Sequence, residues 1–437
     1  MLTRKAWRRF EQWGGSRSGT ALLVTGARQV GKTYLVREFA RARYPRLVEF
    51  NLIDDRAARD SFRQASSAED LAFRLSVASG TPLVPGETLV FIDEVQECPE
   101  IVTWVKFLVD RGDYDYVLSG SLLGIALENV RSLPVGYVTE VQMFPLDFEE
   151  FCWANGVPDE AFARLRQHFA DTEPVADHLH RRLLELWRRY LLVGGMPDAV
   201  AGFARAHSLD PVRTVQEDVR RFYRRDISQY APRDRRLVIQ NIYDLVPSEL
   251  ATQNRRFRLS SIADVRRFAQ VEEEFLWLLR AGVALAAYNV REPVSPLLIN
   301  ESRSLFRLFY SDVGLLTGAF PKPVAQAILA GQPGANLGGV YENAVGQELA
   351  AHGFDLRYFT NRQVGELDFV LENRAGGVTA LEVKSSRNYL SHKALDNALA
   401  VKNYDIQHAY VLAETNTERR GAVVYWPIYM VALLANE

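Results

Sequence analysis

The sequence has little cysteine, little lysine and no long apolar run. Its two cysteines, Cys98 and Cys152, cannot form a disulfide framework or a metal cage, which favours a reducing compartment. The N-terminal residues lack the apolar core of a signal peptide, and the most apolar late stretch, 423–434, is shorter than the roughly 20 residues of a membrane-spanning helix. We therefore expect a cytoplasmic protein that has no membrane partner.

The chain as a whole also lacks an excess of charge of either sign. Lys and Arg together number 52 against 54 Asp and Glu, so any nucleic-acid partner would have to meet a local basic patch. The segment His178–Gln270 offers one, because it contains 18 Arg, no Lys and 10 acidic residues. Guanidinium groups bind phosphate through a bidentate fork, which favours a surface facing nucleic acid. The alternative is a set of solvated helix faces that pair with acids elsewhere.

The length and the hydrophobic pattern predict an α/β protein of about two to three domains. Short apolar runs alternate with helical patterns up to about residue 150, as in a domain with a parallel sheet. A helical, arginine-rich middle follows, and strands return after about residue 330. We predict domains at 1–150, 151–330 and 331–437. Strands are expected at Ala21–Thr25, Leu47–Leu52, Leu89–Asp93 and Tyr116–Ser119, and helices at Lys32–Arg43 and Val102–Arg111.

A phosphate-binding loop is the most specific motif of the chain. Residues 26–33 read GARQVGKT and match G-x-x-x-x-G-K-[ST] between an apolar strand and an amphipathic helix. The glycines let backbone N–H groups point at phosphates, while Lys32 reaches the β- and γ-phosphates and Thr33 binds Mg²⁺. We therefore predict ATP, or a related nucleoside triphosphate, and Mg²⁺ as cofactors. The expected binding residues of the loop are Gly26, Ala27, Arg28, Gln29, Val30, Gly31, Lys32 and Thr33.

A second apolar strand, Leu89–Asp93, ends in a pair of carboxylates typical of a Walker B strand. Asp93 is expected in the Mg²⁺ shell, and Glu94 is expected to polarise the attacking water, which separates hydrolysis from mere binding. The neighbouring strand ends in the sequence SGS. Either Ser119 or Ser121 is expected to contact the γ-phosphate or the water, and the sequence leaves that choice open.

These motifs carry a resemblance to a known family. The runs GARQVGKT, FIDEVQ and SGSLL, with GGMPDA at 194–199, resemble the bacterial and archaeal AAA-type ATPases related to the archaeal ATPase and STAND group. The resemblance extends over nearly the whole chain. It implies an AAA-type N-terminal domain, a helical and winged-helix-like middle, and a C-terminal α/β domain like restriction endonucleases of the PD-(D/E)xK class.

The last hundred residues contain a candidate nuclease centre. Strands are expected at Glu366–Leu371 and Val378–Val383, joined by a hairpin that would bring Asp368 beside Glu382. Both carboxylates could then share Mg²⁺, with Lys384 positioning the nucleophile and Glu342 completing the metal shell from a helix. The alternative is a hairpin whose outer face carries a solvated Glu–Lys pair.

The arginine-rich segment suggests a second use in assembly. In oligomeric ATPases of the resembled type, an arginine of one subunit completes the site of its neighbour. Arg224 and Arg225 are our candidates, with Arg225 as the catalytic choice, so a homo-oligomer is expected. The winged-helix-like segment Leu259–Asn289 departs from a DNA reader, because Glu272–Glu274 would repel phosphate at the start of its third helix. We expect that segment to be a scaffold between domains or subunits.

The sequence thus predicts Mg²⁺-dependent ATP hydrolysis coupled to a nuclease-like domain that cleaves or binds nucleic acid, with DNA favoured over RNA. The alternative is a nucleotide-gated switch whose C-terminal domain binds a partner but has no catalytic activity. A small-molecule kinase built on the same loop is disfavoured, because no acceptor pocket or lid motif stands out in the sequence.

Overall fold

The computed structural model describes residues 2–16, 19–121, 136–252, 255–262, 265–332, 337–386 and 388–436. Cα packing divides the chain into two compact units. The N-terminal unit comprises Thr3–Phe144 with Arg280–Gly282, and the C-terminal unit comprises Pro145–Leu279 and Val283–Glu437 with Met1–Leu2. The boundaries expected near residues 150 and 330 stay predictions. No helix within the described ranges is long and apolar enough to cross a membrane.

The N-terminal unit is built on a five-stranded sheet in the order β2-β3-β4-β1-β5, in which every neighbouring pair is parallel. This sheet confirms the predicted parallel α/β architecture. The strands begin and end within one residue of the four expected ranges, and β5 is an addition. The strands are β1 (Ala21–Thr25), β2 (Arg46–Asn51), β3 (Thr88–Asp93), β4 (Asp115–Ser119) and β5 (Val138–Gln142).

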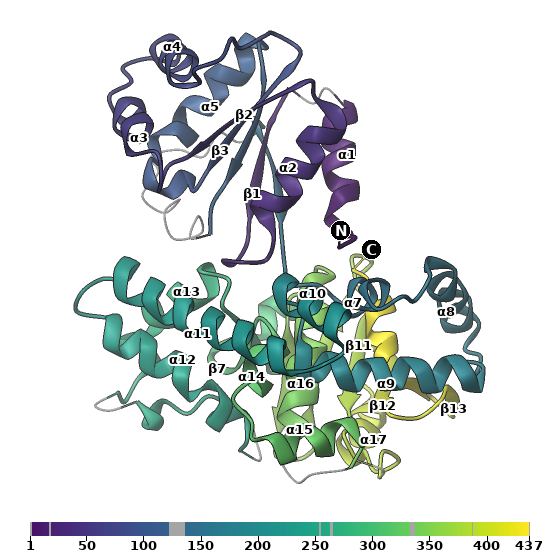
Figure 1. Cartoon of the computed structure of the whole chain (residues 1–437). Coiled ribbons are helices and arrows are strands. Elements are labelled where there is room, and N and C mark those ends of the chain that lie inside the picture. The colour runs from purple at the N-terminus through teal and green to yellow at the C-terminus, as the bar shows by residue number, and fades with distance from the viewer. Residues whose placement is uncertain are drawn as a thin grey trace. The chain divides into compact units, whose positions relative to one another are not determined.

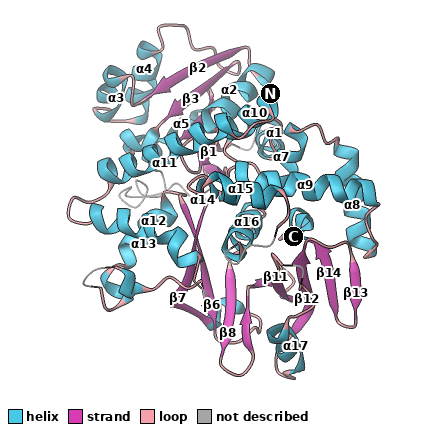
Figure 2. Cartoon of the chain, turned by 60° about the horizontal axis from the view of Figure 1, so that its bottom comes forward, coloured by secondary structure: helices cyan, strands magenta, loops and turns pink. Residues whose placement is uncertain are grey.

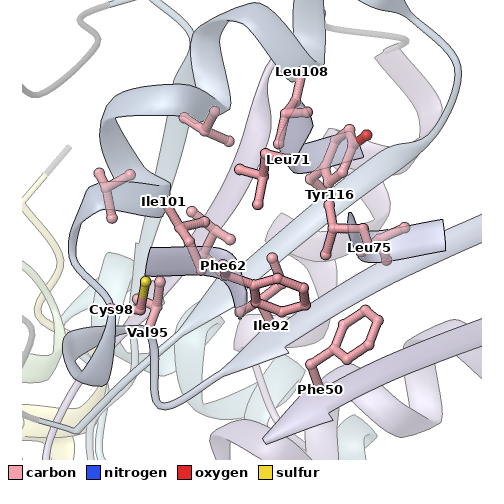
Figure 3. Packing of buried hydrophobic residues seen from close by; sticks show 14 of the residues in the cluster. Phe50, Phe62, Leu71, Leu75, Ile92, Val95, Cys98, Ile101, Leu108 and Tyr116 are labelled. Atoms are coloured by element: carbon pink, nitrogen blue, oxygen red, sulfur yellow. The ribbon is translucent and has the colours of Figure 1, made fainter. Parts of the chain in front are cut away.

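Helices cover both faces of this sheet (Figure 1), which explains why its central strands are continuous apolar runs. A core of buried side chains forms where α3, α4 and α5 pack on β2 and β3, and Phe50, Phe62, Leu71 and Ile92 lie within it (Figure 3). On the opposite face Phe39 of α2 contacts Phe10 of α1 edge to face. The helices are α1 (Ala6–Ser16), α2 (Lys32–Arg43), α3 (Arg56–Arg63), α4 (Ala68–Ala78) and α5 (Glu100–Arg111).

The C-terminal unit begins with a helical region, which contains the arginine-rich segment. Its helices are amphipathic, and α9 buries Leu183, Leu186 and Trp187 while its arginines lie at the other face. The helices are α7 (Phe148–Ala154), α8 (Asp159–Asp171), α9 (Asp177–Val193), α10 (Pro197–Ala206), α11 (Asp210–Tyr230), α12 (Arg236–Leu250), α13 (Glu272–Arg280), α14 (Val313–Thr317), α15 (Lys322–Leu329), α16 (Gly338–Ala351) and α17 (Lys393–Ala400).

The GGMPDA motif has a structural role in this unit. Asp312 caps α14 and accepts hydrogen bonds from the backbone N–H groups of Leu315 (3.0 Å) and Gly195 (2.5 Å). A side chain at position 195 would collide with the carbonyl oxygen of Leu146. Glycine is therefore required at position 195 because the backbone of Leu146 approaches it closely.

Two sheets complete the C-terminal unit (Figure 2). A four-stranded sheet has the order β7-β6-β8-β9, and a five-stranded mixed sheet has the order β10-β11-β12-β14-β13. The strands are β6 (Ala284–Val290), β7 (Glu301–Tyr310), β8 (Arg357–Asn361), β9 (Gly365–Leu367), β10 (Phe369–Glu372), β11 (Val378–Val383), β12 (Ile406–Ala413), β13 (Glu418–Arg420) and β14 (Val423–Pro427).

One expected strand in this unit is wrong. The range Glu366–Leu371 is two strands, because β9 pairs with β8 in one sheet while β10 pairs with β11 in the other. Asp368 lies at the break, where the chain leaves one sheet and enters the next. The apolar alternation of the segment is compatible with either arrangement, so the sequence pattern alone does not reveal the break. The restriction-endonuclease-like fold and the winged-helix-like segment stay predictions.

Candidate functional site

The loop between β1 and α2 has the strained backbone of a phosphate-binding turn. Gly26, Gln29 and Gly31 have φ angles of 132°, 67° and 94°, in the region that disfavours side chains. A Cβ atom on Gly26 would also collide with the carbonyl oxygen of Met143. The first glycine of the motif is thus required by space as well as by conformation.

Lys32 begins α2 and is only 7% exposed. Its Nζ donates hydrogen bonds to the carbonyl oxygens of Gly26 (2.9 Å) and Ala27 (2.8 Å), so the ammonium group is held inside the loop. The N-terminus of α2 adds the positive end of the helix dipole at the same place. Two sources of positive potential therefore coincide where the sequence predicts phosphate.

Asp93, at the end of β3, is held by neutral donors. It accepts hydrogen bonds from the hydroxyl of Thr33 (2.7 Å), the hydroxyl of Ser119 and the backbone N–H of Glu94 (2.9 Å). The carboxylate is 3% exposed, and burial raises its pKa, while the two hydroxyl bonds oppose that shift. The structure thus brings together Thr33 of the phosphate loop and Asp93 at the end of β3, the expected Mg²⁺ ligands, which are 60 residues apart in the sequence.

Glu94 has a left-handed backbone, with a φ angle of 55°. Such a conformation costs a residue other than glycine about 1–3 kcal/mol and is concentrated at functional sites. Its Oε2 accepts hydrogen bonds from Gln96 Nε2 (2.6 Å) and Ser121 Oγ (3.2 Å). The two serines that the sequence left as alternatives therefore both contact the site, Ser119 at Asp93 and Ser121 at Glu94.

Sequence reasoning missed two residues here. Arg4 is 9% exposed and donates to the carbonyl oxygens of Val30 in the loop (2.8 Å) and Phe144 (2.7 Å). No local motif marks Arg4, because its partners lie 26 and 140 residues away. Gln96 lies inside the FIDEVQ run, so its proximity to Glu94 along the chain was a usable signal.

The C-terminal unit assembles the acid–acid–lysine set. Phe369 pairs with Leu381 between β10 and β11, so Asp368 lies opposite Glu382, and Asp368 accepts a hydrogen bond from the Val383 N–H (2.9 Å). Lys384 Nζ donates to Glu382 Oε2 (2.8 Å). Burial, followed by the nearby charge of Asp368, raises the pKa of Glu382 to about 8. This carboxyl group is therefore largely protonated at neutral pH.

Two arginines that the sequence did not single out neutralise the same centre. Glu342 of α16 is fully buried and forms ion pairs with Arg307 (2.9 Å) and with Arg255. The Nη1 atoms of both arginines also lie 3.7 Å from Asp368 Oδ1. Arg307 contacts Glu366 as well, and its guanidinium lies 4.6 Å from the centroid of the Tyr358 ring. The available signal for Arg307 was its position inside the apolar run LFRLFY of β7.

The two centres differ in how well they fit a metal ion. Among the described residues no group of three or more His, Cys, Asp or Glu side chains is arranged to hold one. The Thr33–Asp93 pair still suits Mg²⁺, which takes one or two protein ligands and completes its shell with water and phosphate. The carboxylates of Glu342 and Asp368 face guanidinium groups instead, and this arrangement does not fit a divalent cation.

The arginines proposed for assembly lie on α11. Arg224 is paired with Asp244 on α12 (2.7 Å), whereas the side chain of Arg225 is exposed. Glu274, at the acidic start of α13, is buried and is paired with Arg235 (2.6 Å). The exposure of Arg225 agrees with the choice made from the sequence but does not test it.

Comparison with protein families identifies the N-terminal part. A family model described as an AAA domain matches residues 18–152, so this part of the chain is similar to AAA domains. Residues 184–323 and 337–431 match two families described as domains of unknown function, DUF8612 and DUF4143. No curated protein matches the chain.

Several solved structures overlap the chain at low identity. PCH-2 of C. elegans is 14% identical, covers 50% of this chain and 65% of its own, and has a TM-score of 0.27. Cdc6p of Pyrobaculum aerophilum is 10% identical over 76% of this chain and 96% of its own, with a TM-score of 0.26. RuvB of Thermotoga maritima, a Holliday junction branch migration motor, is 12% identical over 67% and 89%, with a TM-score of 0.29. This chain therefore spans less than two thirds of PCH-2, and the assignment of the AAA-type domain depends on the family model.

Proposed function

We propose that the chain binds ATP and hydrolyses it with Mg²⁺ at the loop formed by residues 26–33. The observation that carries this proposal is the hydrogen bond from Thr33 Oγ1 to Asp93 Oδ2 (2.7 Å), which joins a complete phosphate loop to the strand that ends in two acids. Thr33 and Asp93 would hold the Mg²⁺ ion, which when bound neutralises charge on the phosphate oxygens.

The remaining roles follow from the same geometry. Lys32 would exchange the carbonyl oxygens of Gly26 and Ala27 for β- and γ-phosphate oxygens, which are stronger partners for an ammonium group. Ser119 orients Asp93. Glu94 would exchange its bonds from Gln96 and Ser121 for a water molecule and would accept a proton from that water as it attacks.

Two substitutions test this proposal in the full chain. Lys32→Ala should abolish tight ATP binding, whereas Glu94→Gln should retain binding and stop turnover. Lys106→Ala, on α5 of the same unit, is the matched control and should leave both properties unchanged. ATP binding is measured by equilibrium titration and turnover by phosphate release. Unchanged hydrolysis in both site variants would refute the assignment.

We further propose that ATP turnover is coupled to a C-terminal nuclease-like domain that cleaves or binds nucleic acid, with DNA favoured over RNA. The convergence of Asp368, Glu382 and Lys384 supports cleavage, while the pairing of Glu342 with arginines opposes it. Cleavage of labelled DNA and RNA with Mg²⁺ or Mn²⁺, lost in Asp368→Asn, would establish the activity. No cleavage together with preserved ATP hydrolysis would favour the nucleotide-gated switch.

The proposed homo-oligomer can be tested by mixing inactive variants. If Arg225 completes the site of a neighbouring subunit, Arg225→Ala and Lys32→Ala chains should each be inactive alone. A mixture of the two should regain part of the activity, because some subunits then pair an intact loop with an intact arginine. No recovery, in a mixture shown to assemble, would exclude Arg225 from that role.

A further inference from the structure

Arg255 and Arg307 both contact the acidic centre, but they differ in how they are held. Arg307 lies within β7 and its side chain is 0% exposed. Arg255 lies outside any helix or strand, its side chain is 25% exposed, and its φ angle is 48°. A left-handed backbone at a residue other than glycine persists only where its surroundings hold it in place. Arg255 is therefore the strained and solvent-accessible member of the pair.

A single nitrogen of Arg255 faces two carboxylates. Its Nη1 is paired with Glu342 and lies 3.7 Å from Asp368 Oδ1. Gly338, at the start of α16, leaves the space for this guanidinium, because a Cβ atom there would collide with it. The side chain thus occupies a defined position between one carboxylate on α16 and another at the break between β9 and β10.

Basic groups outnumber ionised carboxyl groups at the centre while Arg255 is present. With the Glu382 carboxyl protonated, the carboxylates of Glu342, Glu366 and Asp368 face four basic groups, those of Arg255, Arg256, Arg307 and Lys384. A divalent cation added to this set would find no uncompensated negative charge. Removing Arg255 frees the carboxylates of Glu342 and Asp368 on the side it covers, while Arg307 stays in the core.

We propose that Arg255 occupies the position at which the acidic centre would bind a divalent cation, and that a cation binds there only when Arg255 is displaced. This inference deepens the proposed nuclease-like function and rests on it. It assigns Arg255 as an internal cation that controls access to Asp368 and Glu342, and it gives Arg307 a structural role. Nucleic-acid phosphate is the class of ligand suited to draw Arg255 away, because guanidinium groups pair with phosphate in a bidentate manner.

Binding of Mn²⁺ by the full chain tests this proposal without relying on activity. Arg255→Gln removes the charge but keeps a hydrogen-bond donor for Glu342, and it should raise Mn²⁺ affinity about tenfold or more over wild type. Arg255→Lys retains a cation and should stay near wild type. Arg258→Gln is the matched control, because Arg258 belongs to the same segment but pairs with Glu249. Isothermal calorimetry on nucleotide-free protein measures each affinity, and the N-terminal site is identical in all of them.

One more variant tests where the additional Mn²⁺ binds. Asp368→Asn on the Arg255→Gln background should abolish the increase in Mn²⁺ affinity, and circular dichroism checks that each variant is folded. Equal Mn²⁺ affinity in wild type and Arg255→Gln would overturn the inference. If wild type and Arg255→Gln both bind Mn²⁺ tightly and cleave DNA, the inference about Arg255 is wrong and the nuclease proposal stands. If neither protein binds Mn²⁺ at this centre, both the inference and the nuclease proposal are wrong. ATP hydrolysis, measured on the same proteins, reports separately on the N-terminal site.

Discussion

Asp93 in the N-terminal unit and Asp368 in the C-terminal unit are both buried carboxylates at the end of a strand, and their partners differ. Asp93 accepts hydrogen bonds from the hydroxyls of Thr33 and Ser119 and from a backbone N–H. Asp368 accepts one backbone hydrogen bond and lies 3.7 Å from guanidinium nitrogens of Arg255 and Arg307. Hydroxyl groups orient a carboxylate without cancelling its charge, whereas guanidinium groups cancel it.

This difference decides which centre is ready for a cation. In the N-terminal site hydroxyl and backbone donors hold Asp93 beside a loop that supplies donors for phosphate, an arrangement that suits the proposed Mg²⁺ and nucleotide. The C-terminal centre has its compensating charges built into the chain. Similar acidic motifs in a sequence can therefore give carboxylates with different partners, hydroxyl groups in one centre and guanidinium groups in the other. The arginines that make the difference lie outside the motifs.

The largest expected effect concerns the N-terminal site. Glu94→Gln should lower the rate of ATP hydrolysis by about 100- to 10,000-fold, the range that a general base contributes. ATP affinity should change little, because Glu94 contacts Gln96 and Ser121 rather than the loop. Single-turnover hydrolysis and equilibrium binding separate the two quantities. A parallel loss of binding would show that Glu94 maintains the loop instead.

The next effect concerns the compensated centre. Arg307→Ala should lower the free energy of unfolding by about 3–5 kcal/mol, because it leaves buried carboxylates without their partner. Arg303→Ala is the control on the same strand, since its side chain is 72% exposed, and it should change stability by no more than about 0.5 kcal/mol. Denaturant unfolding measures both. Equal stabilities would mean that the carboxylates of the centre are not charged in the folded chain.

A pH series sharpens the comparison further. The folded chain holds the Glu382 proton more tightly than the unfolded chain, because the pKa of Glu382 is raised from 4.5 to about 8. The contribution of Glu382 to the free energy of unfolding is therefore fully present below about pH 4.5. It is lost as the pH rises through about 8, by up to about 1.4 kcal/mol per pH unit. Glu382→Gln should remove that slope. An identical pH profile for the two proteins would contradict the raised pKa.

The smallest expected effects separate the two serines. Ser119→Ala removes a fully buried bond to Asp93 and should raise the activation free energy of hydrolysis by about 1–3 kcal/mol. Ser121→Ala loses a longer bond to Glu94 (3.2 Å) and should cost about 0.5–1.5 kcal/mol. Steady-state kinetics at saturating ATP measures both. A larger effect for Ser121→Ala would make Ser121 the residue that senses the γ-phosphate.

The sequence predicted the N-terminal fold because its strands and the phosphate loop are local patterns. Residues 26–33 and the neighbouring ends of β3 and β4 follow from continuous apolar runs and one short motif. Arg4, Arg255 and Arg307 could not be predicted in the same way, because their partners are far away in the sequence. The strand break at Asp368 was missed because the apolar pattern of residues 366–371 is compatible with one strand or with two. Contacts between distant segments, rather than local propensity, decide these features.

The measurement that tests the central claim most directly compares ATP hydrolysis in the wild type, Thr33→Ala and Glu382→Gln. The two substitutions change one carboxylate centre each and leave the other intact. We expect Thr33→Ala to lose Mg²⁺-dependent hydrolysis and Glu382→Gln to retain it, because the proposed Mg²⁺ ligands of the hydrolytic site are Thr33 and Asp93. Retained hydrolysis in Thr33→Ala, or loss in a folded Glu382→Gln protein, would contradict that claim.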